Sequence, residues 1–292
     1  FFYIVVGMAT VIPVTVGVFV VEAALAPGLL DRVGDAFGVG AVLLPYLLPI
    51  TLAKAAGSIL LTHWHDRDQL TIASKRAGDF VSEADRLAEA HIRHALRRVR
   101  PDDGWLGEET GADLGGTRRW IVDPLDGTTN FLHGIGHWAV SLALEDRGAL
   151  TIGIIYDPLK DETFAAIRGG GSTLNGQPIA ISSPHSMSAA LFGTGIPFGD
   201  MPYIEEHATD IARLTPHCAG VRRMGAAALD LAYVAAGRLD GFWERRLQPW
   251  DIAAGLVLLR ESGAQVEGWT EDENPAQSGT VIAATPSLFC DF

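Results

Sequence analysis

Two aspartates stand three residues apart where an apolar segment ends. Asp123 and Asp126 follow the apolar run 120–122, with Pro124 between them. Two carboxylates at the end of a strand can converge on a hard cation such as Mg²⁺, which prefers oxygen ligands. The Gly-Thr-Thr segment at 127–129 offers backbone N–H groups and hydroxyls that suit a phosphate if a helix begins there. The spacing therefore indicates a metal-bridged phosphate, although an ordinary Asp-Pro and Asp-Gly turn explains it equally well.

Three further acidic positions strengthen the metal interpretation. Glu108 belongs to an adjacent pair of glutamates in a tight loop, Asp85 follows a serine-led helix start, and Asp251 begins an apolar segment. Each has an ordinary structural explanation: a solvated turn for Glu108, a capping box for Asp85 and a helix N-cap for Asp251. The combination, more than any single acid, favours a site that holds cations.

Two other catalytic interpretations fit less well. His63 and His65 begin an HxHxD-like pattern, but the residue two positions after the second histidine is Arg67 where the pattern requires aspartate. We interpret this stretch as a surface cluster at a helix end. The acid pairs could also serve a glycosidase, which places two carboxylates around a glycosidic bond. A glycosidase would need neither the phosphate-ready segment at 127–129 nor so many convergent acids.

The elements that must position these residues alternate between helix and strand along 54–292, without a linker or an internal repeat. A helix is expected from Ser82 to the basic residues before Pro101, and the apolar stretch 39–53 leads into an amphipathic helix. This alternation predicts layered α and β structure. The expected strands are 120–122, 139–144, 151–156, 163–167, 179–181, 239–243, 264–266 and 281–284, with helices at 226–236 and 252–261.

Composition narrows the partners of such a site. The 292 residues carry 22 Lys and Arg against 35 Asp and Glu, a formal net charge of −13. So acidic a chain has no broad attraction to nucleic acid or anionic lipid, and no nucleic-acid partner is expected. A phosphate-bearing ligand would need a cation to bind here. Two cysteines without CxxC spacing fit a reducing compartment, which predicts a cytoplasmic catalytic domain.

The first fifty residues differ from the rest. Residues 1–53 contain only four charged side chains and 1–21 contain none, which raises the mean hydropathy to +0.20. A run of about twenty apolar residues is long enough to cross a bilayer as a helix. We therefore expect an apolar N-terminal segment at 1–46, with a candidate membrane helix at 1–21 that would provide membrane contact. The alternative is an extension without a role in the chemistry.

Two longer motifs resemble the signatures of the inositol monophosphatase family. The first is WIVDPLDGTTNF at 120–131, and the second is WDIAAGLVLLRESG at 250–263. Shorter matching motifs occur in the expected order at 55–57, 79–85, 107–109, 175–176, 225–230 and 240–244. The resemblance implies an α+β fold, a layered α/β/α/β/α sandwich of the inositol monophosphatase and fructose-1,6-bisphosphatase type. It covers one catalytic domain at 47–292 and leaves out the apolar N-terminal segment.

The same resemblance implies a Mg²⁺-dependent phosphatase with about two to three ions in its site. Asp123 would bridge two of them, and the attacking water would be positioned by Thr128, itself oriented by Asp85. Residue by residue, the implied metal ligands are Glu108, Asp123, Asp126, Asp251 and the backbone carbonyl of Leu125; the catalytic set is Thr128, Asp85 and Glu108; the phosphate contacts are Gly127 and Thr128; and the contacts to the alcohol are Gly225, Ala227 and Glu244.

The residues after the paired aspartates favour one branch of this superfamily. Gly-Thr-Thr-Asn-Phe at 127–131 resembles the inositol-phosphatase branch, whereas nucleotide and histidinol-phosphate branches commonly place Lys after Gly-Thr. We expect a small phosphorylated polyol or sugar as substrate, lithium sensitivity and a homodimer. The alternatives are a sister phosphatase for fructose 1,6-bisphosphate, histidinol phosphate or a nucleotide 3′-phosphate, and a catalytically silent binding or regulatory protein. Two departures from the family pattern, at 169–172 and Ala226, are expected near the substrate.

Overall fold

The computed structural model describes residues 40–67, 72–76, 79–113, 115–184, 186–196, 203–270 and 272–292. The segment 1–39, with the membrane helix expected at 1–21, lies outside the described residues. Within them, no helix is both long and apolar enough to cross a membrane.

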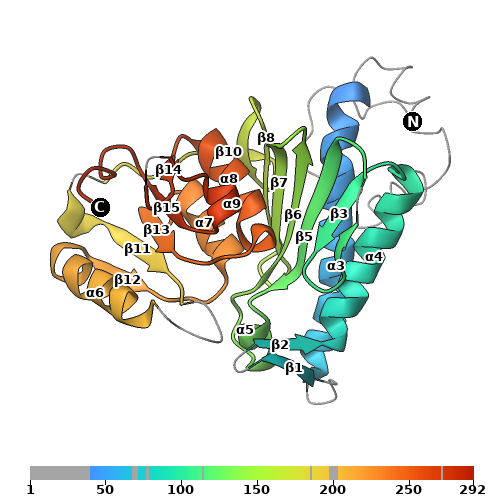
Figure 1. The fold of residues 1–292 in the computed structure, drawn as a ribbon, viewed down its shortest axis with the longest axis horizontal. Coiled ribbons are helices and arrows are strands. Elements are labelled where there is room, and N and C mark those ends of the chain that lie inside the picture. Colours follow the sequence, from blue (N-terminus) through green and yellow to red (C-terminus); the bar gives the residue numbers. More distant parts are fainter. Residues whose placement is uncertain are drawn as a thin grey trace.

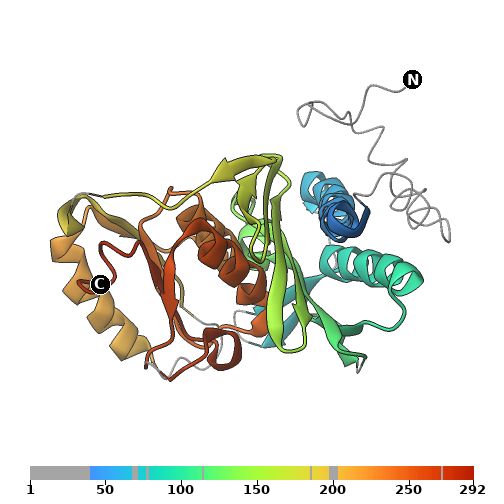
Figure 2. The ribbon, with the colours of Figure 1, turned by 90° about the horizontal axis from the view of Figure 1, so that it is seen from above.

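Five layers of secondary structure are stacked along the longest axis of the molecule (Figure 1). Helices α3 (Gly40–His65) and α4 (Glu83–Val99) lie side by side against one face of a large sheet (Figure 2). Helices α7 (Ala227–Ala235) and α8 (Pro249–Ser262) lie between its other face and a small sheet. Helix α6 (Ile204–Leu214) covers the outer face of the small sheet. This order confirms the α+β class and the layered α/β/α/β/α sandwich.

The large sheet is mixed, with strand order β10-β9-β8-β7-β6-β5-β3-β4, and the small sheet has the order β12-β11-β13-β15-β14. An antiparallel pair, β1 and β2, precedes α4. The strand bounds are β1 Ile72–Arg76, β2 Asp79–Ser82, β3 Gly104–Gly107, β4 Gly111–Asp113, β5 Arg118–Asp126, β6 Ala139–Asp146, β7 Ala149–Asp157, β8 Glu162–Ile167, β9 Gly171–Leu174, β10 Gln177–Ile179, β11 Leu191–Thr194, β12 Gly220–Arg222, β13 Gly241–Glu244, β14 Gln265–Glu267 and β15 Val281–Ala284. The short helices are α5 Thr128–Leu132, η2 Met187–Ala189, η3 Thr215–His217 and α9 Pro275–Ser278.

Strand β6 shows why the large sheet lies between two helical layers. Its buried side chains alternate between two cores: Ala139 and Ala143 face the core shared with α7 and α8, while Val140 and Leu142 face the core shared with α3 and α4. A strand that is covered on both faces carries apolar residues at successive positions, without polar alternation. The sequence of β6 therefore places it inside the sandwich.

Helix α8 is apolar around most of its circumference, because both sheets enclose it. Its Gly255 lies against Leu231 of α7, where an added Cβ would come 2.5 Å from the leucine side chain. The missing side chain therefore sets how closely α7 and α8 approach.

Strand β5 extends beyond the expected strand 120–122 and continues through Pro124 to Asp126. Its pairing with β6 shifts in register between Asp123 and Asp126. Proline is tolerated at such an irregularity because it has no N–H to contribute to the ladder. The turn expected at Pro124 is therefore a bulge within the strand, and both aspartates belong to β5.

Candidate active site

The end of β5 forms the centre of the site. Asp123 and Asp126 are 2% and 8% exposed. Oδ1 of Asp123 accepts the N–H of Leu125 at 2.9 Å, and Oδ2 of Asp126 accepts the N–H of Ala228 at 2.8 Å. A buried carboxylate is costly without hydrogen-bond partners. These bonds therefore hold both side chains in place, and the second ties β5 to the first turn of α7.

Gly127 makes the turn from β5 into α5. Its φ of 93° lies in the left-handed region, which glycine adopts without steric cost. Helix α5 begins at Thr128, so a helix does start within the Gly-Thr-Thr segment 127–129, as phosphate binding there requires. The Thr128 hydroxyl lies 3.1 Å from Oδ1 of Asp85 and 3.0 Å from the carbonyl oxygen of Leu125. The structure thus brings Thr128, Asp85 and Leu125 together.

Asp85 uses its two oxygens for different partners. Oδ2 accepts hydrogen bonds from the backbone N–H and the hydroxyl of Ser82, which completes a capping box at the start of α4. Oδ1 accepts the hydrogen bond from Thr128. Burial raises the pKa of Asp85 to about 6, opposed by the bonds from Ser82. The capping explanation for Asp85 is confirmed, and the contact that a role beside Thr128 requires is present as well.

The paired aspartates have strongly perturbed protonation. The pKa of Asp123 is well above its ordinary value, first because of burial and then because of the charges of Glu108, Asp126 and Asp251. Burial raises the pKa of Asp126 to about 7, and the charge of Asp230 adds to the effect although the Ala228 N–H opposes it. Carboxylates from β5, from α8 and from the turn after β3 therefore act on one another in a region of low dielectric.

Glu108 lies in the turn between β3 and β4 and is partly buried, not solvated as a bare turn would be. Its N–H donates to the carbonyl of Val122 at 3.2 Å, directly before Asp123. Glu89 of α4, which is fully buried, holds the same turn because its Oε2 accepts the N–H of Glu109 at 2.8 Å. Glu89 is thus a supporting residue, one helical turn after Asp85, that the sequence analysis did not single out.

Asp251 lies in the first turn of α8, but it is not the N-cap that was expected. The N-cap is Gln248, and Asp251 is the third helical residue, whose Oδ2 accepts the N–H of Gln248 at 2.7 Å. The N-cap expectation was wrong because Pro249 opens the helix, as proline often does at the first helical position. The charge of Asp251 nonetheless reaches Asp123.

The residues expected to contact the alcohol portion of the substrate come from β13 of the small sheet and from the start of the neighbouring helix α7. Glu244 ends β13 and is 5% exposed, Ala227 begins α7, and Gly225 precedes that helix with a φ of 87°. Burial, followed by the charges of Asp251 and other carboxylates, raises the pKa of Glu244 well above its ordinary value. The charges of Asp251 and Asp126 both act on Glu244, so Glu244 belongs to the same cluster of interacting carboxylates.

The donor set fits Mg²⁺, although the side chains are not arranged around an ion. In the part of the chain that the structure describes, no three His, Cys, Asp or Glu side chains form a ready metal-holding group. Asp123, Asp126 and Asp251 instead accept backbone N–H groups. All the expected donors are oxygens, which Mg²⁺ prefers. Burial, and after it the repulsion from neighbouring carboxylates, raises the pKa of Asp123, and a divalent cation would relieve that repulsion.

Three further side chains join the site, all missed by the sequence analysis as functional positions. Asn130 donates to the carbonyls of His137 and Met224, both at 2.8 Å. Nε2 of His137 lies 2.8 Å from Oδ1 of Asp230 in a buried pair. The only available signals were the motifs that contain Asn130 and Asp230, because Met224 is 94 positions from Asn130 and Asp230 is 93 positions from His137.

The histidine pattern at the end of α3 is a helix-end cluster, as interpreted. His63 and His65 occupy its last turn, and the Arg67 guanidinium stacks over the Trp64 ring at 4.1 Å. Trp64 in turn contacts Phe131 of α5, with ring centroids 5.4 Å apart. The cluster therefore packs beneath the site through its tryptophan.

The two departures from the family pattern have different positions. The glycine-rich run 169–172 is not near the substrate side, because the N–H groups of Gly169 and Gly171 bond Glu261 at the C-terminal end of α8. Asp251 lies at the opposite end of that helix, so the expectation for 169–172 was wrong. Ala226 is close to the site: its Cβ would lie 3.1 Å from a Cβ added to Gly127.

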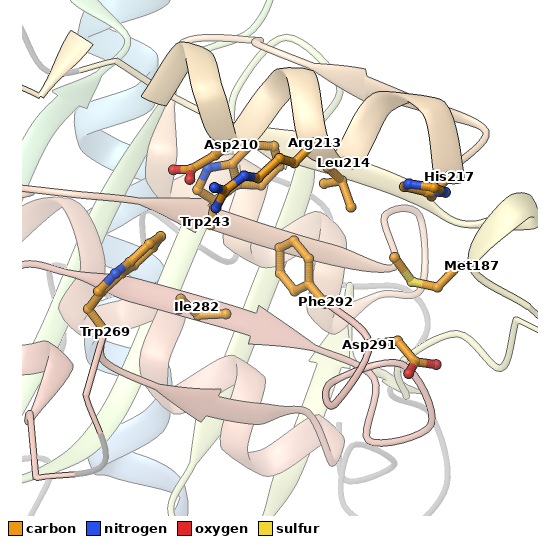
Figure 3. Close-up of a pocket in the computed structure, with 10 residues that line it drawn as sticks. All are labelled: Met187, Asp210, Arg213, Leu214, His217, Trp243, Trp269, Ile282, Asp291 and Phe292. Atoms are coloured by element: carbon orange, nitrogen blue, oxygen red, sulfur yellow. The ribbon is translucent and has the colours of Figure 1, made fainter. Parts of the chain in front are cut away.

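A cavity of about 540 Å³ lies between α6 and the small sheet (Figure 3). Trp243 of β13 lines it together with Phe292 and Leu214. Successive side chains of a strand point to opposite faces of its sheet, so Trp243 and Glu244 face opposite ways. The cavity is therefore separated from the carboxylate cluster by the small sheet and does not belong to the candidate active site.

The layered α/β/α/β/α sandwich, with clustered acids beside a Gly-Thr-Thr helix start, is typical of phosphatases with the inositol monophosphatase and fructose-1,6-bisphosphatase fold. Comparison with known proteins gives the same class. The model of the inositol monophosphatase family matches residues 46–289. The chain belongs to the inositol monophosphatase family, and it is a phosphatase of that superfamily.

Three relatives show how similar the chain is to known proteins. The inositol-1-monophosphatase of Rhizobium meliloti is 45% identical over 240 residues, which cover 80% of this chain and 88% of that protein. The Nus factor SuhB of Pseudomonas aeruginosa is 40% identical over 248 residues, covering 83% and 92%. The crystal structure of the extragenic suppressor protein SuhB of Bartonella henselae superposes with a TM-score of 0.81 at 39% identity, covering 84% and 95%.

Proposed function

We propose that the chain hydrolyses phosphate monoesters of inositol or of a related sugar or sugar alcohol, with Mg²⁺ as cofactor. The single observation that carries this proposal is the cluster in which Asp123, Asp126, Asp251 and Glu108 act on one another next to Thr128. Hydrolysis of phosphate monoesters is among the slowest uncatalysed reactions, so concentrated positive charge is the help it needs most. A protein with a net charge of −13 can supply positive charge at its site if clustered carboxylates bind cations there.

In this mechanism the carboxylates of Glu108, Asp123, Asp126 and Asp251 and the carbonyl of Leu125 would hold about two to three Mg²⁺ ions. Such ions, when bound, would make the attacking water more acidic and offset the charge that develops on the phosphoryl group and the leaving oxygen. Asp85 accepts the Thr128 hydroxyl hydrogen, so Thr128 can accept a hydrogen bond from the attacking water. Backbone N–H groups at Gly127 and Thr128 hold the phosphate.

The alcohol portion of the substrate is recognised by Gly225, Ala227 and Glu244. The Glu244 carboxyl has oxygens that accept hydrogen bonds from hydroxyls, which a polyol offers in number. The relative from Rhizobium meliloti is named an inositol-1-monophosphatase, which supports an inositol phosphate as the first substrate to test. Fructose 1,6-bisphosphate, histidinol phosphate and a nucleotide 3′-phosphate remain the sister candidates. We also expect lithium to inhibit the reaction and the chain to form a homodimer.

The catalytic unit is proposed to be 47–292, separate from the apolar segment 1–46. Helix α3 crosses this boundary, because it begins at Gly40. Its packing supports the division: Leu47 is 43% exposed, whereas Leu52, Ala53 and Ala56 are buried in the core. A cytoplasmic location and a membrane role for 1–21 stay predictions, and fractionation of the full chain without detergent tests the latter.

The test is phosphate release by the full chain from a panel of these esters, with Mg²⁺ and then with EDTA. We expect release from inositol phosphate that stops with EDTA. Asp126→Asn and Asp251→Asn should each lower turnover by more than the roughly 10- to 100-fold that loss of a supporting partner costs at metal sites. Asp161→Asn, which removes a surface ion pair with Lys54 and alters the hydrogen bond from the Tyr156 hydroxyl, is the control and should keep activity.

Two outcomes decide against the proposal. A folded protein that releases no phosphate from any ester would favour a catalytically silent binding or regulatory protein. The name of one relative, Nus factor SuhB, is the reason for this alternative. Full activity in both Asp126→Asn and Asp251→Asn would refute the ligand assignment while leaving the phosphatase class intact.

A further inference from the structure

Two loops meet at the candidate site although they are almost a hundred residues apart. The phosphate loop, residues 123–132, holds the phosphate side, and the alcohol loop, residues 224–228, holds the alcohol side. Their contact is close: a Cβ added to Gly127 would lie 3.1 Å from the Cβ of Ala226 and 3.0 Å from the carbonyl oxygen of His137. The distance between phosphate and alcohol contacts therefore depends on what fixes this junction.

Asn130 is the first tie across the junction. It is 7% exposed, and its Nδ2 donates to the carbonyl oxygens of His137 and Met224 at 2.8 Å, with the Gly225 carbonyl at 3.4 Å. The NH₂ group has two hydrogens, so the two short bonds use both of its donors. Both bonds are buried or partly buried, where an unmade bond is expensive. Asn130 thus joins the phosphate loop to the alcohol loop directly.

The buried pair of His137 and Asp230 is the second tie. Nε2 of His137 lies 2.8 Å from Oδ1 of Asp230, and the two residues are 9% and 1% exposed. Asp230 belongs to the first turn of α7, where the N–H of Ala228 also reaches Asp126 at 2.8 Å. The pair therefore holds the start of α7, and with it Ala227, against the segment that follows the phosphate loop.

We propose that Asn130, His137 and Asp230 act together as a positioning clamp that sets the spacing between the phosphate loop and the alcohol loop, and so selects substrates with a hydroxyl-bearing alcohol. The inference rests on the proposed function. None of the three side chains touches substrate in this scheme. They act through Gly225 and Ala227, and a misplacement of about 1 Å in such contacts can cost about 100-fold in rate.

The clamp predicts a change in selectivity rather than a uniform loss. Inositol 1-phosphate uses both loops, because its ring hydroxyls meet the alcohol side. An aryl ester such as p-nitrophenyl phosphate has the same phosphate but no hydroxyls on its ring, so it depends on the phosphate loop alone. The ratio of kcat/KM for the two esters therefore reports the spacing between the loops, whereas partial unfolding lowers both values in parallel.

The experiment compares Asn130→Ala and His137→Ala with the wild type on both esters, with Mg²⁺ saturating. We expect the ratio of inositol to aryl kcat/KM to fall at least about tenfold in each variant. His137→Gln, whose amide can still bond Asp230, should recover most of the ratio. Asn175→Ala is the control, because the Asn175 side chain accepts the N–H of Thr163 and donates to the carbonyl of Asp161, contacts that involve neither loop, and its loss should leave the ratio unchanged.

The outcomes separate this inference from the proposed function. A wild type that hydrolyses neither ester overturns both. A wild type that hydrolyses both esters, with an unchanged ratio in His137→Ala and Asn130→Ala, overturns the clamp alone. If Asn130→Ala fails to fold, the pair His137→Ala and His137→Gln decides: a ratio that falls in the first and recovers in the second supports the clamp, and equal ratios refute it.

Discussion

At the scale of single residues, Glu244 has almost no freedom to move. A Cβ added to Gly195 would lie 2.0 Å from Oε2 of Glu244, so the carboxyl group rests on the bare backbone of that glycine. The same residue is 5% exposed, and this burial raises the pKa of its carboxyl group. Gly195 therefore belongs to the site through the space it leaves, although it has no functional group of its own.

Gly195→Ala should displace Glu244 and weaken its hold on the alcohol portion of the substrate. We expect KM for inositol phosphate to rise by about tenfold, which corresponds to about 1.4 kcal/mol, with a smaller effect on p-nitrophenyl phosphate. Steady-state kinetics on both esters check this. The control is Gly170→Ala, in an exposed loop where the added Cβ would lie 3.2 Å from a backbone oxygen. Equal KM values in Gly195→Ala and wild type would contradict the steric argument.

The acids of the candidate site could be named from the sequence because each lies in a short motif that carries the family resemblance. Asp123, Asp126 and Thr128 lie within six residues of one another, but their spacing alone also fits an ordinary turn, and only the resemblance of the motif at 120–131 to the family signature singles them out. The supporting residues could not be found in this way. Asn130 and Met224 are 94 positions apart, and only the packed fold brings them to 2.8 Å. Gly195 gives no chemical signal at all, since its contribution is an absent side chain.

At the scale of elements, the contact between α7 and α8 depends on one glycine. Gly255 of α8 faces Leu231 of α7 with no space for a methyl group. Both helices carry site residues at their first turns, Ala227 and Asp251. The crossing of the two helices therefore sets the distance between the alcohol side and one of the acids.

Gly255→Ala should destabilise the protein even though alanine is the better helix former. Helix propensity alone would stabilise by about 1 kcal/mol. Overpacking against Leu231 costs about 1 to 3 kcal/mol, and the clash should win because the neighbouring side chain is buried. Urea unfolding measures the sign. The double variant Gly255→Ala, Leu231→Ala should recover part of the loss, and a stabilised single variant would show that the helices separate without cost.

Elements with clear periodicity were predictable, and short ones bounded by tertiary contacts were not. Strand β15 has the expected bounds 281–284, and β6 and β7 each extend the expected strand by two or three residues in total. Strands β3, β4 and β12 are three or four residues long and contain glycine, so their sequences carry no period that marks a strand. Their pairing defines them: β3 pairs with β5, β4 with β3, and β12 with β11.

At the scale of the whole molecule, the cluster of acids makes stability depend on pH and on metal. The pKa values of Asp85 and Asp126, about 6 and about 7, lie above the ordinary value of 3.8, so the folded state keeps protons that the unfolded state has released. The free energy of unfolding of the metal-free protein therefore falls as the pH rises through this range. The upper limit is about 1.4 kcal/mol per carboxyl for each pH unit.

Urea unfolding in EDTA between about pH 5 and pH 8 tests this dependence, with Asp126→Asn as control. The difference between the two proteins isolates Asp126 from His207, whose pKa is lowered by burial and which opposes the trend at low pH. The wild type should lose stability with rising pH more steeply than Asp126→Asn. Added Mg²⁺ should stabilise the wild type more at high pH, because metal binding competes with protons. Parallel curves for both proteins would contradict the assignment.

The two hydrogen-bonding roles of Asp85 have a practical consequence for mutational screens. One carboxyl group caps α4 and also meets Thr128. A substitution there removes the Asp85 half of the capping box, whose N-cap is Ser82, together with the contact at the site. Surveys that read variant effects through protein abundance will therefore score Asp85 as a folding position, while surveys that read growth on a phosphorylated nutrient will score it as an activity position. Agreement between such surveys at this residue carries no information about mechanism.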